Sequence, residues 1–381
     1  MDPHELAKPI EELLQQAISE GVFPGACFSV YQGSHRLSGS VGRHTYCPES
    51  STNKTKDIFD LASVSKVVGT TTLVMRAFEK GKIELDAPVS RYIPEFGVNG
   101  KESITLRNLL VHNSGLIAFR PYQKTCNNAT EVLTAIYGET LTYPTGSKTI
   151  YSDLSMILMA EVLRRVDGRA IEQQFQEDVA KPLGLKRTGY FVYGKSTTLS
   201  KVSFRDCIPT EKIEDWRISL REKRHGAKEA ARIYGHMPDY IQGEVHDPTA
   251  TAMGGVAGHA GLFSTVEDLT TFMRDFMSQS PKCISTEVRN QFIRRQSTES
   301  TRALGWDTKS EKGSSAGDYF GPLSFGHTGY TGTSVWCDPT TGLTAILLTN
   351  RVHPSSDNTK IIQFRPRFHN LVHETINKLK K

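Results

Sequence analysis

Hydrophobic residues repeat at helical spacing at both ends of the chain. Near the N-terminus they recur three and four positions apart, which predicts an amphipathic helix over residues 3–20. Gly21 and the Pro24-Gly25 pair end it, because glycine and proline interrupt a helical pattern. The apolar residues from Phe368 to Leu379 have the same spacing, so we expect a second amphipathic helix to close the chain.

Strand-like runs lie next to both terminal helices. Residues 26–31 and 36–46 flank a turn around Gly33, and residues 334–337 and 343–351 flank a second turn. Between these regions the pattern is mainly helical, with helices predicted over residues 63–79, 105–112, 155–166, 172–179 and 265–277. Ser264 and Glu267 fit a capping box at the start of the last of these.

This order predicts an α/β (α+β) fold in which the two ends of the chain share one antiparallel sheet. We expect a discontinuous sheet domain made of residues 1–60 and 265–381, and a mainly helical domain made of residues 61–264. Residues 210–240 fit neither pattern and indicate an insertion. An active site would lie in the groove between the two domains.

Composition excludes several classes of protein. A chain of 381 residues with 38% hydrophobic and 23% charged residues is typical of a folded protein, and a net charge of +5 gives no sign of nucleic-acid binding. The basic stretch Arg217–Arg232 also carries acidic residues, so we expect a solvated face. The six cysteines show no zinc-binding spacing and are expected to be free, buried thiols.

No run approaches the roughly 18 apolar residues of a membrane-spanning helix. Residues 1–21 also lack the basic and apolar regions of a signal peptide. The sequence as written therefore predicts the cytoplasm, or the periplasm if a leader has been removed.

The most informative motif is the tetrapeptide Ser63-Val64-Ser65-Lys66. Residues i and i+3 share a helix face, so the Ser63 hydroxyl and the Lys66 amine can meet. A serine hydroxyl needs a neighbouring base near neutral pH. Lysine can be that base if burial and nearby positive charge lower its pKa. S-x-x-K also arises by chance at helix starts, so its surroundings decide.

Two further motifs follow in order, Tyr151-Ser152-Asp153 and His327-Thr328-Gly329, the latter expected on an edge strand. Together the three motifs resemble those of the penicillin-recognising serine hydrolases. The resemblance is strongest to the branch that holds class C β-lactamases, D,D-carboxypeptidases, D-aminopeptidases and related esterases. Residues 59–62, 104–116 and 258–265 are similar to this family as well.

The resemblance implies a β-lactamase/transpeptidase-like fold and assigns roles. Ser63 would attack a carbonyl and form an acyl-enzyme, and Lys66 would accept its proton or hold the local field. Tyr151 would act as a base if Lys66 and His327 favour its deprotonated form, and would then return a proton to the leaving group. The backbone N–H groups of Ser63 and Tyr330 would form the oxyanion hole.

The third motif would form the opposite wall of the site, with His327, Thr328 and Gly329 binding substrate. Histidine stands here where most β-lactamases have lysine, as in certain D,D-carboxypeptidases and D-aminopeptidases. It would bind a carboxylate less firmly at neutral pH. Asp153 replaces the usual asparagine and would bind a substrate amide carbonyl only if protonated, or would cap the following helix. Both departures argue against an efficient β-lactamase.

These observations favour a D-alanyl-D-alanine carboxypeptidase-like enzyme acting on peptidoglycan peptides. A short-chain carboxylesterase and a weak β-lactamase are the alternatives among enzymes. A non-catalytic penicillin-binding sensor is the alternative of another class, and the altered second and third motifs favour it. Because Ser63, Lys66 and Tyr151 are all retained, we expect turnover. The substrate is a small molecule or peptide, and the oligomeric state is not readable.

Three other patterns in the sequence could indicate functional residues. Residues 313–317 match the G-x-S-x-G nucleophile elbow, but their polar surroundings predict a loop. His369 and His373 stand four apart, as zinc ligands can, but without a third ligand we expect them on the helix surface. We predict no metal and no cofactor. Residues 244–247 precede the glycine-rich loop 253–261, and for them a place at the groove is the less favoured interpretation.

Overall fold

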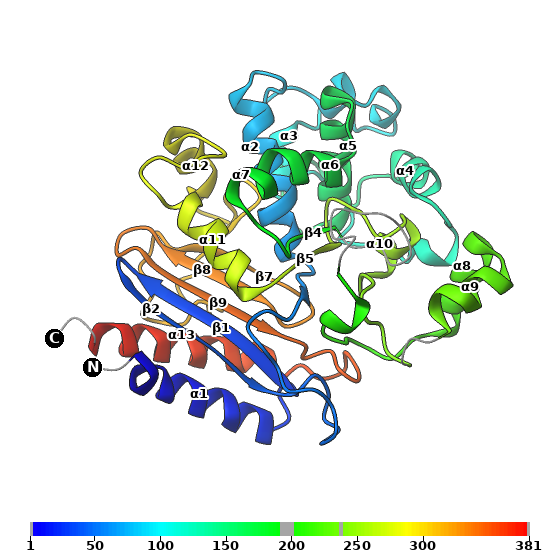
Figure 1. Cartoon of the computed structure of the whole chain (residues 1–381). Coiled ribbons are helices and arrows are strands. Elements are labelled where there is room, and N and C mark those ends of the chain that lie inside the picture. The colour runs from blue at the N-terminus through cyan, green and yellow to red at the C-terminus, as the bar shows by residue number, and fades with distance from the viewer. Residues whose placement is uncertain (1–2, 191–201, 236–238, 379–381) are drawn as a thin grey trace.

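A six-stranded antiparallel sheet in the order β2-β1-β9-β8-β7-β6 joins the two ends of the chain (Figure 1). The computed structural model describes residues 3–190, 202–235 and 239–378. Strand β1 (Gly25–Gln32) pairs with β2 (His35–Gly42) on one side and with β9 (Leu343–Thr349) on the other. The sheet shared by the N- and C-terminal segments, predicted from the sequence, is therefore present.

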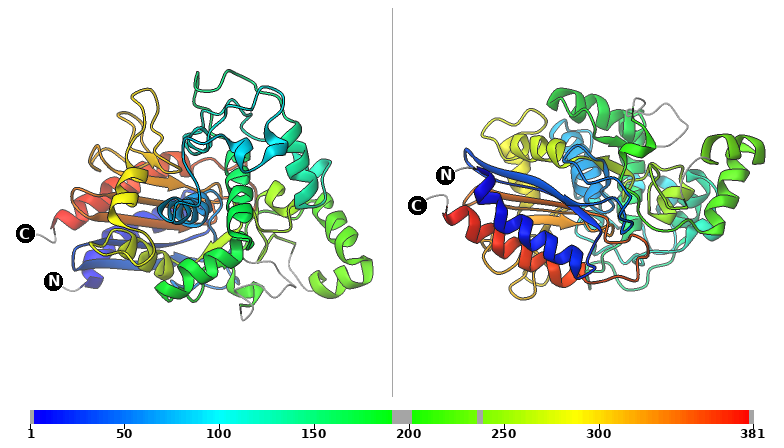
Figure 2. Two further views of the ribbon diagram at one scale, coloured as in Figure 1. Left: turned by 90° about the horizontal axis from the view of Figure 1, so that it is seen from above. Right: turned by 60° about the horizontal axis from the view of Figure 1, so that its bottom comes forward.

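Helices cover both faces of this sheet. Helices α1 (Pro3–Ser19) and α13 (Ile361–Lys378) lie side by side on one face (Figure 2). Helix α11 (Val266–Phe276) packs on the other face. Successive side chains of a strand point to opposite faces. Phe28 of β1 accordingly joins the core beside α1 and α13, and Cys27 joins the larger core beneath the helical part.

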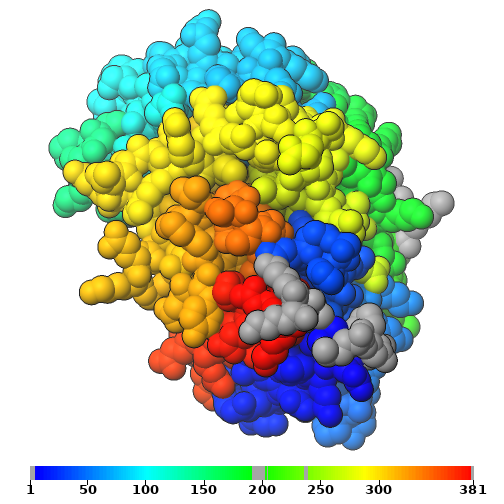
Figure 3. Space-filling model, turned by 90° about the vertical axis from the view of Figure 1, so that its left-hand side faces the viewer, coloured from blue at the N-terminus to red at the C-terminus, as the bar shows by residue number. Residues whose placement is uncertain are grey.

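On the face shown in Figure 3, the red C-terminal segment lies beside the blue N-terminal segment, in agreement with the contact between α1 and α13. The remaining strands of the large sheet are β6 (Asp307–Thr308), β7 (Phe325–Thr328) and β8 (Ser334–Asp338). Because β6 pairs only with Phe325 and Gly326, the end of β7 that carries His327 and Thr328 has no paired strand on that side within the described residues.

A helical layer and a small sheet complete the fold. The small sheet has the order β3-β5-β4, made of β3 (Phe59–Asp60), β5 (Leu262–Ser264) and β4 (Gly189–Tyr190). A π-helical turn at Lys66–Thr71 leads into α2 (Thr72–Glu79). The other helices are α3 (Leu106–Leu110), α4 (Ala129–Gly138), α5 (Asp153–Asp167), α6 (Ile171–Phe175), α7 (Lys181–Leu183), α8 (Asp215–His225), α9 (Ala227–Tyr234), α10 (Pro248–Ala252) and α12 (Thr286–Ile293).

The predicted insertion contains α8 and α9, and its residues 236–238 lie outside the described residues. The domain boundaries at 60/61 and 264/265 stay predictions. Among the described residues, no helix has both the length and the apolar character that crossing a membrane requires. Residues 313–317 form turns, as the polar surroundings predicted.

Four local predictions were wrong. Arg217 of the basic stretch is only 2% exposed, because its guanidinium binds backbone carbonyls inside the protein. His369 is buried, because it lies on the apolar face of α13. Cys47 is exposed, whereas the other five cysteines are buried. The residue that caps α11 is Thr265, whose side chain accepts from the Asp268 N–H.

Candidate active site

Ser63 lies in a tight turn between β3 and the π-helical turn. The preceding residue, Ala62, has a φ of 46°, which residues other than glycine rarely adopt. The buried Asp60 carboxylate accepts the Ala62 N–H at 2.8 Å and so supports this conformation. The Thr333 hydroxyl donates to the Leu61 carbonyl at 2.9 Å. The turn that carries Ser63 is therefore held from its own strand and from the large sheet.

Gly329 of the third motif packs against this turn. A Cβ atom at this position would collide with the Leu61 carbonyl oxygen and the Thr333 hydroxyl. Arg365 of α13 donates to the Gly329 carbonyl at 2.7 Å and to the Thr333 carbonyl at 3.0 Å. The glycine therefore allows the strand to approach the nucleophile turn, and the buried arginine keeps it there.

Lys66 is buried, and its ammonium has three acceptors. The Nζ atom lies 2.8 Å from Ser63 Oγ, 2.9 Å from the His259 carbonyl oxygen and 2.7 Å from Asp153 Oδ1. Burial by itself lowers the pKa of Lys66, but the charges of Asp153 and Tyr151 outweigh it and raise this pKa above its ordinary value. The condition under which Lys66 could serve as the base, a lowered pKa, is therefore not met while Asp153 is paired with it.

Asp153 is the first residue of α5, but it does not cap the helix. The N-cap residue is Ser152, and the Asp153 side chain turns to Lys66 instead. Its N–H donates to the Ala118 carbonyl at 2.9 Å, which fixes the start of the helix. As a carboxylate paired with Lys66, Asp153 offers a substrate only acceptors.

Tyr151 lies between two histidines and two cations. Its ring centroid is 4.6 Å from that of His112 and 5.8 Å from that of His327. Lys66 Nζ lies 5.0 Å from the Tyr151 centroid and the Arg302 guanidinium carbon lies 4.9 Å from it. The phenol oxygen is buried and has no hydrogen-bond partner among the described residues. The two cations would stabilise negative charge on that oxygen.

His327 is a neutral histidine in this site. Burial lowers its pKa well below the ordinary value, and the charges of Arg302 and Lys66 lower it further. Its Nδ1 lies 2.8 Å from the Thr328 carbonyl oxygen and donates to it, which leaves Nε2 without a proton and without a partner among the described residues. A neutral imidazole cannot pair with a substrate carboxylate as a cation would.

The two expected oxyanion donors are available. Neither the Ser63 nor the Tyr330 N–H donates a hydrogen bond within the described part of the chain. Tyr330 is 55% exposed. The Arg351 guanidinium carbon lies 4.3 Å from the Tyr330 ring centroid, and the His246 ring centroid lies 5.7 Å from it. Arg351 Nε also donates to the Tyr330 carbonyl at 2.7 Å, so the backbone here is fixed. The oxyanion role stays a prediction.

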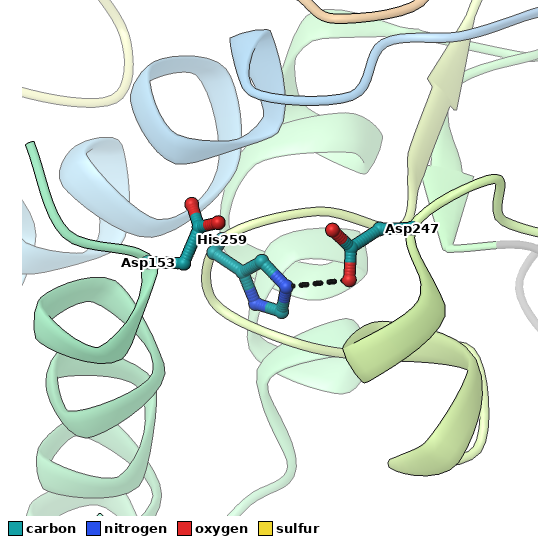
Figure 4. Close-up of side chains that lie close together, drawn as sticks. All are labelled: Asp153, Asp247 and His259. Atoms are coloured by element: carbon teal, nitrogen blue, oxygen red, sulfur yellow. Dashed lines mark hydrogen bonds and ion pairs between the residues drawn. The ribbon is translucent and has the colours of Figure 1, made fainter. Parts of the chain in front are cut away.

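A second cluster joins Asp153 to Asp247 and His259 (Figure 4). Their side-chain ligand atoms lie within 4.8 Å of one another, a spacing that suits a metal ion. Two observations favour an internal arrangement instead. His259 Nε2 lies 2.8 Å from Asp247 Oδ1, and the Lys66 ammonium already faces Asp153.

Sequence reasoning brought Ser63, Lys66, Tyr151, Asp153 and the third motif into one site, and the structure places them together. It missed Arg302 and His112 as neighbours of Tyr151. His112 lies within residues 104–116, quoted for their resemblance, and this was the available signal. Arg302 stands in a polar stretch without a motif, so no signal in the sequence points to it.

Comparison with known proteins shows which family and which relatives have similar sequences. The family model described as Beta-lactamase matches residues 10–197 and 210–365. Two curated relatives cover most of the chain. "N-acetylmuramyl-L-alanine amidase" of Bacillus subtilis (strain 168) is 29% identical over 91% of this chain and 81% of its own length. "Putative D-alanyl-D-alanine carboxypeptidase" of Salmonella agona (strain SL483) is 28% identical over 81% of this chain and 72% of its own length.

Solved structures share the fold at low sequence identity. A class C beta-lactamase superimposes with a TM-score of 0.72 at 17% identity, covering 97% of this chain and 98% of the other. "EstCE1, a hydrolase with promiscuous acyltransferase activity" superimposes with a TM-score of 0.71 at 20% identity, covering 96% of this chain and 99% of the other. The predicted β-lactamase/transpeptidase-like fold is thereby confirmed.

Replacing Ser63 by alanine tests the nucleophile. We expect hydrolysis of p-nitrophenyl acetate to fall by about 10³-fold or more, because the acyl-enzyme cannot form. The matched control is Ser315→Ala, which removes the serine of the G-x-S-x-G loop and is expected to leave turnover unchanged. Equal loss in both variants, or full activity of Ser63→Ala, would contradict the assignment.

Replacing Asp153 by asparagine tests whether Lys66 is the base. The carboxylate raises the Lys66 pKa, so its removal lowers that pKa and makes the neutral amine available at lower pH. We expect the acid limb of the kcat/KM profile for ester hydrolysis to move down by about 1–3 pH units. Asp167→Asn, at the other end of α5, is the control. An unmoved acid limb would exclude Lys66 as the titrating base.

Removal of divalent cations tests the prediction that no metal is needed. We expect protein treated with EDTA to hydrolyse p-nitrophenyl acetate as before, because Lys66 supplies the positive charge beside Asp153. Zinc content measured by mass spectrometry accompanies the assay. Stoichiometric zinc whose removal abolishes turnover would overturn the serine mechanism.

Proposed function

The chain belongs to the beta-lactamase family of serine hydrolases, and we propose that it acts as a D-alanyl-D-alanine carboxypeptidase-like enzyme on peptidoglycan peptides. Ser63 would form the acyl-enzyme, with Lys66 and Tyr151 moving the proton. The Ser63 and Tyr330 N–H groups would bind the acyl oxygen. Water would then release the shortened peptide.

The observation that carries the proposal is the position of Arg302. A carboxypeptidase must bind the free carboxylate at the end of its substrate, and the neutral His327 is a poor partner for it. The Arg302 guanidinium lies 4.9 Å from the Tyr151 ring centroid, and its charge acts on His327. Among the described residues its ion-pair partner is Asp307, whose carboxylate oxygen is 4.0 Å away, so the guanidinium is only weakly paired. Arg302 would bind the terminal carboxylate of the substrate.

The names of the two relatives support the same substrate. One is named "Putative D-alanyl-D-alanine carboxypeptidase" and the other "N-acetylmuramyl-L-alanine amidase". Both names describe hydrolysis of an amide bond next to alanine in cell-wall material. At 28–29% identity over most of the chain, they favour a peptidoglycan substrate.

A short-chain carboxylesterase is the second candidate, and the Lys66–Asp153 pair favours it. Substrate amides in this family are expected to meet an asparagine, whose side chain can donate to the carbonyl. Asp153 offers only acceptors and is already paired at 2.7 Å. A simple ester has no acylamide carbonyl that needs this donor, so the change to Asp153 would not weaken its binding.

Release of D-alanine from a muropeptide ending in D-Ala-D-Ala tests the proposal. We expect release by the wild type. In Arg302→Gln we expect kcat/KM for the peptide to fall about 10–100-fold more than kcat/KM for p-nitrophenyl acetate, since a hydrogen bond to a charged group contributes about 1.5–3 kcal/mol. Arg295→Gln, an exposed arginine before the same turn, is the control.

Three outcomes would overturn the carboxypeptidase proposal. Ester turnover without D-alanine release favours the esterase. Release of L-alanine-linked peptide from N-acetylmuramic acid favours an amidase. Stable labelling by a fluorescent penicillin, with turnover of neither substrate, favours the penicillin-binding sensor.

A further inference from the structure

Two consecutive residues that follow the insertion, His246 and Asp247, lie beside the serine site. The His246 N–H donates to Asp60 Oδ2 at 2.6 Å, and the other oxygen of Asp60 holds the Ala62 N–H in the nucleophile turn. One buried carboxylate therefore ties residue 246 to the turn that carries Ser63. Asp247, the next residue, points to His259 (Figure 4).

Asp247 makes two hydrogen bonds through the same oxygen. Its Oδ1 accepts from the Ala250 N–H at 2.7 Å, which caps α10, and faces His259 Nε2 at 2.8 Å. Burial by itself raises the pKa of Asp247, but His259, Ala250 and Lys66 outweigh it and hold the pKa well below the ordinary value. An ionised carboxylate can only accept, so His259 Nε2 carries the proton.

His259 connects this pair to Lys66 through its backbone. Its carbonyl oxygen accepts from Lys66 Nζ at 2.9 Å, while its ring is held by Asp247. The ring is buried, and its other nitrogen has no partner among the described residues. The bond to Asp247 is thus the polar contact that fixes the His259 side chain. Lys66 in turn lies 2.8 Å from Ser63 Oγ.

Arg217 of α8 holds the same segment from the other side. It donates to the Val245 carbonyl at 3.1 Å, the His246 carbonyl at 2.9 Å and the Thr251 hydroxyl at 2.7 Å. Its burial, without a carboxylate within hydrogen-bond distance in the described residues, lowers its pKa. Arg217 therefore fixes the backbone just before Asp247 and the Thr251 side chain after it.

We propose that Asp247 and His259 are positioning residues of the serine site. As a hydrogen-bonded pair they hold the His259 carbonyl against Lys66, and so hold Lys66 against Ser63. Neither residue needs to touch the substrate. The inference rests on the acyl transfer at Ser63 proposed above, but not on whether the substrate is a peptide or an ester. The inference also gives the insertion a role, because Arg217 of α8 binds the segment that carries Asp247.

The experiment compares alanine variants with variants that keep the hydrogen bond. Glutamine at position 259 places an N–H near the place of Nε2, and asparagine at position 247 keeps an acceptor oxygen for both donors. We expect His259→Ala and Asp247→Ala to lower kcat for p-nitrophenyl acetate by about 10–100-fold, because small misplacements of reacting groups cost rates of this size. KM should change little. His259→Gln and Asp247→Asn should recover most of the loss.

Two further measurements keep the result interpretable. The rate of labelling by a fluorophosphonate probe reports the reactivity of Ser63 even if the ester is a poor substrate. Ser285→Ala removes a helix cap at α12, far from the site, and controls for lost stability alone. If the alanine variant at 259 does not fold, His259→Phe fills the same volume without a donor and is expected to be equally slow.

The outcomes separate this inference from the substrate proposal. Absence of D-alanine release with normal ester turnover overturns only the carboxypeptidase. Alanine variants with wild-type kcat and labelling rate would overturn the positioning role. So would a loss confined to KM, or glutamine and asparagine variants as slow as the alanine ones.

Discussion

The ammonium of Lys66, buried to 1% exposure, is the constraint on which the rest of the site depends. A buried charge costs several kcal/mol unless it is paired and its hydrogen bonds are satisfied. Three separate parts of the chain meet this requirement: the nucleophile turn through Ser63, the start of α5 through Asp153, and the glycine-rich loop through the His259 carbonyl. Asp153 pairs the charge, and the other two parts satisfy its remaining hydrogen bonds, so the same contacts that stabilise Lys66 also fix the geometry around Ser63.

Charge in the site is redistributed relative to the family pattern, and the changes compensate one another. The usual lysine of the third motif is a histidine, which burial and two neighbouring cations keep neutral. The usual asparagine of the second motif is Asp153, which adds a negative charge beside Lys66. Arg302 then brings back a cation on the other side of Tyr151. In the proposed carboxypeptidase, the positive charge that would bind a substrate carboxylate therefore comes from Arg302 and not from the strand.

The sequence could predict those features that depend on residues close together in the chain, and not those that depend on contacts between distant segments. Helices α1 and α13 and strands β1, β8 and β9 carry their own periodicity, and the nucleophile, its lysine and Tyr151 stand in short motifs. The pairing of Asp153 with Lys66 depends on how α5 meets the nucleophile turn, which no local pattern encodes. Burial of Arg217 depends on carbonyls of residues 245 and 246, so a short polar helix looked solvated. His369 could have been found, since its spacing from Val372 and Ile376 places it on the apolar face of α13.

The resting geometry also bears on which group accepts the serine proton. A protonated Lys66 donates to all three of its acceptors, Ser63 Oγ included, and therefore cannot accept from it. Two cations, Lys66 and Arg302, lie 5.0 Å and 4.9 Å from the Tyr151 ring centroid, and the phenol oxygen has no hydrogen-bond partner among the described residues, so it can still accept one. With Asp153 paired, the resting geometry favours Tyr151 over Lys66 as the group that would accept the proton of Ser63. Loss of the Asp153 charge would lower the Lys66 pKa and let the neutral amine compete for that proton. The residue that departs from the family pattern is therefore also the one that selects the base.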